Sequence, residues 1–203
     1  MNNIKKLQVF DFDGTLYRNP QPNPVLYDNR TFGKITNSYN GNGYGWHHNV
    51  ITLNPKYATV NNFIQPTVDA AKNAIHDKDT MTIMMTGRLE EFRPLIEKLL
   101  IEKELFFDRI LLKPSEDYTT FNYKIGVIEK ILKDNPNILE VTIWDDRDSH
   151  IKYFTKWAET YSKTQRPLLV NIKHVKYPIY HLPINDEKDI LDVLKADSRF
   201  SLK

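Results

Sequence analysis

Short apolar runs separated by longer amphipathic segments dominate the sequence. The apolar runs predict buried strands, because a strand that is covered on both faces is apolar throughout. These predicted strands cover residues 7–10, 81–85, 107–112, 139–144 and 168–172. Between them, apolar residues recur at the spacing of helices that bury one face. The predicted helices lie at about 66–76, 92–100, 125–132, 151–161 and 186–194. This alternation favours an α/β fold with a doubly wound, mostly parallel sheet.

Residues 17 to about 60 interrupt the alternation of strands and helices. The segment is rich in Asn, Pro, Gly and Tyr and has no sustained period. It therefore predicts an irregular insertion with at most short strands or turns. Its aromatic residues, Trp46 among them, argue against disorder. We expect a single domain over residues 1–203, with a small flap-like or cap-like insertion at about 17–60.

Two carboxylates, Asp11 and Asp13, directly follow the first predicted strand. In an extended chain they point to the same side, because alternate residues share a face. Open α/β sheets bind their ligands at the carboxyl ends of strands. Two carboxylates this close repel each other unless a cation lies between them. Because Mg²⁺ binds through one or two carboxylates and keeps sites for water and phosphate oxygens, the pair predicts a magnesium site.

Composition narrows the class of protein further. The length of 203 residues, with 40% hydrophobic and 12% aromatic residues, suits one folded α/β domain. A net charge of +2 neither implies nor excludes a nucleic acid partner. Cysteine is absent, which excludes disulfides, zinc thiolate sites and cysteine nucleophiles. No apolar stretch has membrane-spanning length and no signal peptide precedes Asp11, so we expect an intracellular protein that is soluble and by default cytoplasmic.

The stretch Asp11-Phe12-Asp13-Gly14-Thr15 resembles the first motif of the haloacid dehalogenase (HAD) superfamily. The resemblance implies a Rossmann-like sheet and a magnesium-dependent phosphatase with an aspartyl nucleophile. Asp11 would attack phosphorus, and Asp13 would protonate the leaving oxygen and then activate water. Mg²⁺ would be bound by Asp11, the backbone carbonyl of Asp13, Asp146 and the phosphate. The superfamily's dehalogenases lack the second acid, so Asp13 favours a phosphatase.

The second motif of the superfamily is matched by Thr86-Gly87-Arg88 at the end of the second predicted strand. In the family, this hydroxyl donates a hydrogen bond to a phosphoryl oxygen. The resemblance thus assigns Thr86 to catalysis and Gly14, Gly87 and Arg88 to substrate binding. A helix N-cap is the competing interpretation of Thr86, and both roles are compatible because a helix N-terminus binds anions.

The third motif is a lysine, for which the sequence offers two candidates. Lys124 lies near the start of the helix before the last acidic strand and is the better match. There its ammonium would neutralise the nucleophile and the phosphoryl group. Lys113, at the end of the third predicted strand, is the alternative. Without the resemblance, either lysine would be read as a solvated surface residue.

Asp145-Asp146 matches the fourth motif, which supplies the remaining metal carboxylate. Asp146 is the predicted direct magnesium ligand, and Asp145 would act through a water molecule. Taken alone, such a pair is usually a turn or a helix cap. Arg147 and His150 are further candidates for substrate contacts, although each could equally make a salt bridge or cap a helix.

A narrower resemblance covers most of residues 9–154. The Pro-x-Pro-Asn-Pro of residues 20–24, Gly45-Trp46-His47, and Asp146-Arg147 with His150 are similar to the HAD domains termed Swiss Army Knife RNA repair-like. This resemblance implies removal of terminal phosphates from nucleic acid ends. Tyr39, Tyr44 and Trp46 would then stack on bases, or would simply anchor their loop to the domain.

The two resemblances together imply a Mg²⁺-dependent phosphomonoesterase whose substrate is a nucleic acid end. Two alternatives stay open. One is a small-molecule phosphatase such as a nucleotidase, which substrate preference would distinguish. The other is a non-catalytic module that binds phosphate or nucleic acid, which an absence of hydrolysis would favour. No membrane partner is expected.

Overall fold

The computed structural model describes residues 4–36, 46–48, 50–115, 117 and 119–182. The chain forms two compact units. Residues 1–18 and 60–177 make up the first unit, and residues 19–59 and 178–203 make up the second. The first unit contains the whole described sheet and all acidic motif residues.

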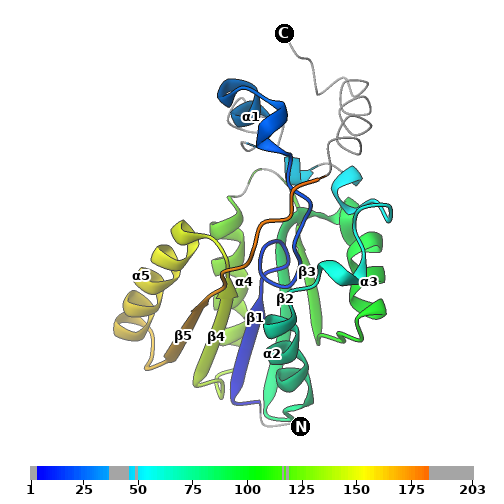
Figure 1. Cartoon of the computed structure of the whole chain (residues 1–203). Coiled ribbons are helices and arrows are strands. Elements are labelled where there is room, and N and C mark those ends of the chain that lie inside the picture. Colours follow the sequence, from blue (N-terminus) through cyan, green and yellow to red (C-terminus); the bar gives the residue numbers. More distant parts are fainter. Residues whose placement is uncertain (1–3, 37–45, 49, 116, 118, 183–203) are drawn as a thin grey trace. The chain divides into compact units, whose positions relative to one another are not determined.

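The sheet has five strands, all parallel, in the order β3-β2-β1-β4-β5 (Figure 1). The strands are β1 (Lys6–Phe10), β2 (Thr80–Leu89), β3 (Arg109–Lys113), β4 (Glu140–Asp145) and β5 (Leu169–His174). From β1 the chain first adds β2 and β3 on one side and then β4 and β5 on the other, so the direction in which strands are added reverses at β1. The predicted doubly wound α/β fold is confirmed, and the sheet is parallel throughout the described chain.

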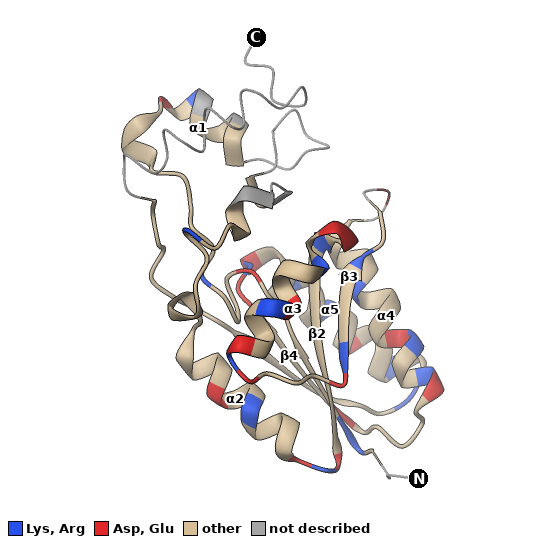
Figure 2. Ribbon diagram, turned by 90° about the vertical axis from the view of Figure 1, so that its right-hand side faces the viewer, with Lys and Arg blue, Asp and Glu red and all other residues tan. Residues whose placement is uncertain are grey.

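Four helices flank this sheet. They are α2 (Gln65–His76), α3 (Arg93–Glu102), α4 (Thr120–Asp134) and α5 (Asp148–Thr164). Figure 2 shows α2 and α3 on one face of the sheet and α4 on the other. Helices α4 and α5 share an apolar core with alternate residues of the strands, such as Leu7 and Val9 of β1 and Ile128 of α4. Because Asp11 continues this alternation, it emerges on the same face as α4.

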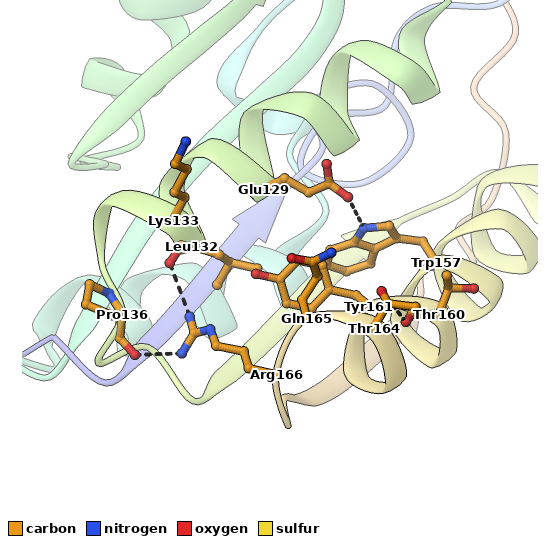
Figure 3. A pocket seen from close by; sticks show the side chains of 10 residues that line it. All are labelled: Glu129, Leu132, Lys133, Pro136, Trp157, Thr160, Tyr161, Thr164, Gln165 and Arg166. Carbon is orange, nitrogen blue, oxygen red and sulfur yellow. Dashed lines mark hydrogen bonds between the residues drawn. The ribbon is translucent and has the colours of Figure 1, made fainter.

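A groove of about 490 Å³ separates the C-terminal halves of α4 and α5 (Figure 3). Trp157 donates from Nε1 to a carboxylate oxygen of Glu129 at 2.9 Å across it. Arg166 donates to the carbonyl oxygens of Pro136 at 2.6 Å and Leu132 at 3.2 Å. These carbonyls lie at the end of α4, where helix carbonyls lack intrahelical partners. These hydrogen bonds link the two helices across the groove, which lies at a distance from the acidic motifs.

Two element boundaries near the second motif differ from the sequence-based prediction. Strand β2 continues to Leu89, past Thr86, with an irregular register against β3 between these two residues. Phe92 belongs to a short 3₁₀ turn, Glu90–Phe92, and α3 begins only at Arg93. Both differences arise because the second motif is extended backbone, which apolar periodicity does not reveal.

Where the structure describes it, the second unit contains an α-helix, α1 (Asn29–Thr36), and the short 3₁₀ helices Pro24–Leu26, Trp46–His48 and Val50–Leu53. The expectation of at most short strands or turns in this segment was therefore wrong. The helix escaped prediction because only Phe32 and Ile35 among its eight residues are large and apolar, which is too few to establish a period.

Backbone pairing closes the described part of the second unit. Gln21 N donates to the carbonyl of Tyr180 at 2.8 Å, and Leu182 N donates to the carbonyl of Gln21 at 3.0 Å. The predicted helix at 186–194 and the aromatic residues Tyr39 and Tyr44 lie outside the described residues. None of the helices in the described ranges has the length and apolarity needed to cross a bilayer.

Candidate active site

The polar ends of three neighbouring strands meet at one edge of the first unit. Asp11 directly follows β1, Thr86 lies near the end of β2, and Asp145 is the last residue of β4. Asp11 N donates to the carbonyl of Trp144 at 3.0 Å, which extends the pairing of β1 and β4 by one step. Strand order reverses here, and this is the position at which open α/β sheets bind ligands.

Lys124 joins two of these acids from the first turns of α4. Its ammonium lies 2.9 Å from Asp11 Oδ1 and 2.8 Å from Asp145 Oδ2, and 2% of the lysine is exposed. Burial alone would lower the pKa of Lys124, but Asp11 and Asp145 outweigh it and raise that pKa, so the ammonium stays charged. Lys113, the alternative candidate, is also buried but lies at the end of β3. Lys124 is the lysine that contacts Asp11.

Asp145 has hydrogen-bond donors on both oxygens. Besides Lys124, the backbone N–H of Arg147 donates to Oδ1 at 3.0 Å. The imidazole of His150 donates from Nδ1 to Oδ2 at 3.0 Å and lies 3.2 Å from Oδ1. Burial would raise the pKa of Asp145, but Lys124 and then His150 lower it well below its usual range. Asp145 is therefore an ionised, fully paired carboxylate that fixes Lys124 and His150, and it does not cap α5 with its side chain.

Asp146 contrasts with Asp145 in having a buried side-chain atom, Oδ1, without a hydrogen-bond partner in the described chain. Burial, followed by the negative charges of Asp11 and Asp145, raises the pKa of Asp146 to about 7. Its backbone carbonyl accepts a hydrogen bond from Nε2 of His174, at 3.0 Å. Asp146 thus places an unpaired oxygen beside Asp11.

These carboxylates fit a divalent cation. Asp11, Asp145 and Asp146 each offer an oxygen, and the three oxygens lie within 4.8 Å of one another. Burial raises the pKa of Asp11 as well, with Lys124 opposing this in part. A hard cation such as Mg²⁺ matches an all-oxygen donor set and would satisfy the unpaired Asp146 oxygen. Since Asp145 already has its donors, Asp11 and Asp146 are the carboxylates available for direct coordination.

Asp13 is held by the second motif. Arg88 donates from Nε to both carboxylate oxygens at 3.0 Å and from Nη2 to Oδ1 at 2.9 Å. Thr86 donates to Oδ2 at 3.3 Å and accepts a hydrogen bond from Arg88 N at 3.1 Å. The guanidinium also packs over the ring of Phe92, at 4.8 Å. Because Thr86 lies inside β2 and caps no helix, the N-cap interpretation of this residue is wrong.

Two glycines allow the loops of the site to approach closely. Gly14 has φ of +74°, and a Cβ atom placed on it would lie 2.2 Å from Asp146 Oδ2. A Cβ atom on Gly87 would lie 2.6 Å from Thr120 Oγ1, at the start of α4. Glycine is thus required where the first motif meets the fourth and where the second motif meets α4.

A family model for "HAD domain family 1 in Swiss Army Knife RNA repair proteins" matches residues 19–196. This chain belongs to that family. The match to the family model begins after the first motif, so the assignment does not depend on Asp11 and Asp13. It agrees with the all-parallel sheet and with the resemblance seen in the other motifs.

Known proteins resemble this HAD domain in sequence and fold. "Uncharacterized protein YMR265C" of Saccharomyces cerevisiae is 31% identical over 171 residues, covering 74% of this chain and 36% of that protein. This HAD domain therefore spans about a third of the length of that relative. A chain of the Pnkp1/Rnl/Hen1 RNA repair complex has a TM-score of 0.51 at 14% identity, covering 87% of this chain and 45% of that one. At this identity, the likeness shows a shared fold.

The structure brings most of the residues predicted for the site together in the first unit of this HAD domain. They are Asp11, Asp13, Gly14, Thr86, Gly87, Arg88, Lys124, Asp145, Asp146, Arg147 and His150. Trp46 lies in the second unit, where it is 2% exposed and donates from Nε1 to the carbonyl of Pro20 at 2.8 Å. That contact agrees with the alternative role of a loop anchor.

Two further residues at the site, His174 and Tyr177, were not predicted from the sequence. His174 ends β5 and contacts the backbone of Asp146, and the Tyr177 hydroxyl lies 2.9 Å from the point that a Cβ on Gly14 would occupy. Neither residue belongs to a recognised motif. The available signal was topological, because the end of the last strand reaches the same edge of the sheet.

Proposed function

We propose that this HAD domain is a Mg²⁺-dependent phosphomonoesterase with Asp11 as nucleophile. The observation that carries the proposal is the buried pairing of Lys124 with Asp11 and Asp145, next to Asp146 with its unpaired oxygen. Such an arrangement places a carboxylate nucleophile beside a fixed positive charge, and a bound cation would favour its ionised form. This is what attack on an anionic phosphate requires.

Each motif residue has a role in the proposed reaction. Asp11 attacks phosphorus and forms an aspartyl phosphate, and Asp13 transfers protons to the leaving oxygen and from the water that follows. Thr86 and Lys124 hydrogen-bond the phosphoryl oxygens as negative charge spreads over them. The metal would be held by Asp11, Asp146 and the backbone carbonyl of Asp13, with Asp145 behind a water, and would neutralise phosphate charge.

Arg88 controls the protonation of Asp13 in this scheme. A bidentate guanidinium favours the ionised carboxylate, which suits Asp13 as the base of the second step. For the first step Asp13 must carry a proton. We infer that the incoming phosphate draws Arg88 or Thr86 away from Asp13. Both side chains are donors, and each can bind a phosphate oxygen in place of a carboxylate oxygen.

The proposed substrate class is a nucleic acid end that carries a terminal phosphate. The support is the family's connection with RNA repair proteins. We further propose that residues 17–60 act as a small insertion of a single HAD domain, in which Trp46 anchors its own loop through Pro20.

Hydrolysis assays with Mg²⁺ test the proposal directly. Turnover is measured on oligonucleotides with a 3′-phosphate or a 5′-phosphate, on mononucleotides and on an aryl phosphate. We expect hydrolysis of phosphorylated ends, no activity in Asp11→Asn, and acid-stable phosphate labelling only in the wild type. A preference for mononucleotides would overturn the nucleic acid assignment, and a lack of hydrolysis across the panel would overturn the phosphatase assignment.

A further inference from the structure

Tyr177 is carried to the acidic site by the chain that leaves β5. Val175 N donates to the carbonyl of Asp145 at 3.0 Å, so the pairing with β4 continues past the end of β5. The Val175 side chain is buried at the same place. Tyr177 follows two residues later and is the last residue of the first unit. Its position is thus tied to the sheet that carries Asp145.

The hydroxyl of Tyr177 lies beside Gly14 and Asp146. It is 2.9 Å from the point that a Cβ atom on Gly14 would occupy, and Asp146 Oδ2 is 2.2 Å from that same point. The phenol oxygen and the predicted metal carboxylate therefore both lie beside the glycine turn and close to each other. A larger residue at position 14 would push both of them away.

The charges around Tyr177 keep its proton in place. Burial, and then the negative charges of Asp146, Asp13 and Asp11, raise the pKa of Tyr177 to about 12. The phenol is therefore neutral under physiological conditions and acts as a hydrogen-bond donor. It faces the carboxylates that the proposed reaction uses.

Tyr123 and Tyr177 differ in whether the hydroxyl has a hydrogen-bond partner among the described residues. The pKa of Tyr123 is likewise raised to about 12, chiefly by burial, but its hydroxyl donates to the carbonyl of Leu112 at 2.7 Å. Within the described ranges, no residue makes a hydrogen bond with the hydroxyl of Tyr177. The side chain of Tyr177 is only partly buried, so its hydroxyl can donate to water or to a ligand. A hydroxyl that faces the site without a protein acceptor is available to a ligand.

We propose that Tyr177 is a substrate-binding residue, whose hydroxyl donates a hydrogen bond to an oxygen of the bound phosphomonoester on the Asp146 side of the site. The inference rests on the proposed phosphatase function and adds a donor that no motif contains. The other donors to the phosphate in the proposed site are Thr86 of β2 and Lys124 of α4. It transfers no proton and serves only to bind and orient the phosphate.

Phosphate binding measures this role without requiring turnover. Isothermal titration of the full chain with inorganic phosphate in the presence of Mg²⁺ compares the wild type with Tyr177→Phe and with Tyr161→Phe as a matched control. Tyr161 lies in the groove between α4 and α5, away from the acids. We expect Tyr177→Phe to bind phosphate roughly three- to tenfold more weakly, the worth of one neutral hydrogen bond, and Tyr161→Phe to be unchanged. The Mg²⁺ affinity and the melting temperature of both variants should stay at the wild-type values.

The outcomes distinguish the inference from the function on which it rests. Equal phosphate affinity in the wild type and Tyr177→Phe would overturn the role of Tyr177 and leave the phosphatase intact. A marked fall in the melting temperature of Tyr177→Phe would assign the hydroxyl to stability and would also overturn it. A wild-type protein that neither binds phosphate nor hydrolyses any phosphomonoester would overturn both. A raised KM for aryl phosphate in Tyr177→Phe, with kcat little changed, would support a binding role.

Discussion

Arg88 holds both carboxylate oxygens of Asp13 through Nε and Nη2, at 2.9 to 3.0 Å, and both residues are buried. The family resemblance assigns Arg88 to the substrate and Asp13 to proton transfer, yet here the two are paired with each other. A donor that is already oriented can pass to a phosphate without a search through rotamers. In the proposed reaction, the pairing would connect binding of the phosphate with release of Asp13 from Arg88.

Replacement of Arg88 by Ala should affect stability and activity together. It leaves Asp13 buried without its cation, which typically costs about 3 kcal/mol or more in the free energy of unfolding. Chemical denaturation measures this loss, and kcat should fall roughly 100-fold or more because Asp13 is no longer oriented. Arg93→Ala is the control, since the ion pairs of Arg93 with Glu90 and Glu97 are partly exposed and should contribute no more than about 1 kcal/mol each. Equal losses in the two variants would contradict the special role of the Arg88 pair.

Replacement of Lys124 by Met should abolish most of the activity. The change leaves Asp11 and Asp145 facing each other without the ammonium between them. The loss of one preorganised charge should lower kcat roughly 100- to 1,000-fold, measured on any substrate that the wild type hydrolyses. Lys130→Met on the same helix removes an exposed pair with Asp134 and should change kcat and stability little. Near wild-type turnover by Lys124→Met would rule out its assigned role.

Much of the fold follows from the sequence because its central strands contain buried apolar runs. Ile83 to Met85 of β2, for example, are apolar and fully buried, and helices with apolar faces follow β2, β3 and β4. The acidic residues could be placed in one site for the same reason, since parallel strands end at one edge of the sheet. The order of the strands then brings Asp11 beside Asp145 without further information.

The pairings within the site could not be read from spacing. Nothing in the sequence indicates that Asp13 accepts from Arg88 across 75 positions, or that Asp145 is saturated while Asp146 keeps an unpaired oxygen. Both outcomes depend on side-chain directions at irregular backbone, in the glycine turn at Gly14 and in the irregular end of β2. Tyr177 was missed because its approach depends on how the chain leaves β5, which no local pattern specifies.

Stability without metal should fall as pH rises. The pKa of Asp146 is about 7 in the folded chain against 3.8 in the unfolded chain, so the folded state retains a proton that the unfolded state loses. The contribution of Asp146 is complete below pH 3.8 and is lost as pH rises toward 7. Urea unfolding with a chelator should show a decrease of roughly 1–3 kcal/mol attributable to this group, and Asp146→Asn should remove it.

Addition of Mg²⁺ should reverse this trend. The cation needs the ionised carboxylate, so it should raise the melting temperature more at pH 8 than at pH 5, since Asp146 is protonated at the lower pH. Asp146→Asn should respond weakly at both values. Ca²⁺ at the same concentration tests whether the site prefers the smaller ion. An equal response of the wild type and Asp146→Asn to Mg²⁺ would exclude Asp146 as a metal ligand.

Two Gly→Ala substitutions should have opposite effects. At Gly14, φ is +74° and the new Cβ would lie 2.2 Å from Asp146 Oδ2, so Gly14→Ala should lose roughly 1–3 kcal/mol of stability and most of the activity. At Gly126, inside α4, a Cβ would meet nothing within 4 Å. Gly126→Ala should therefore stabilise the protein by about 0.5–1 kcal/mol through helix propensity alone, with kcat unchanged. Urea unfolding and turnover of both variants check the pair. Tolerance of alanine at position 14 with full activity would show that the glycine turn does not set the position of Asp146.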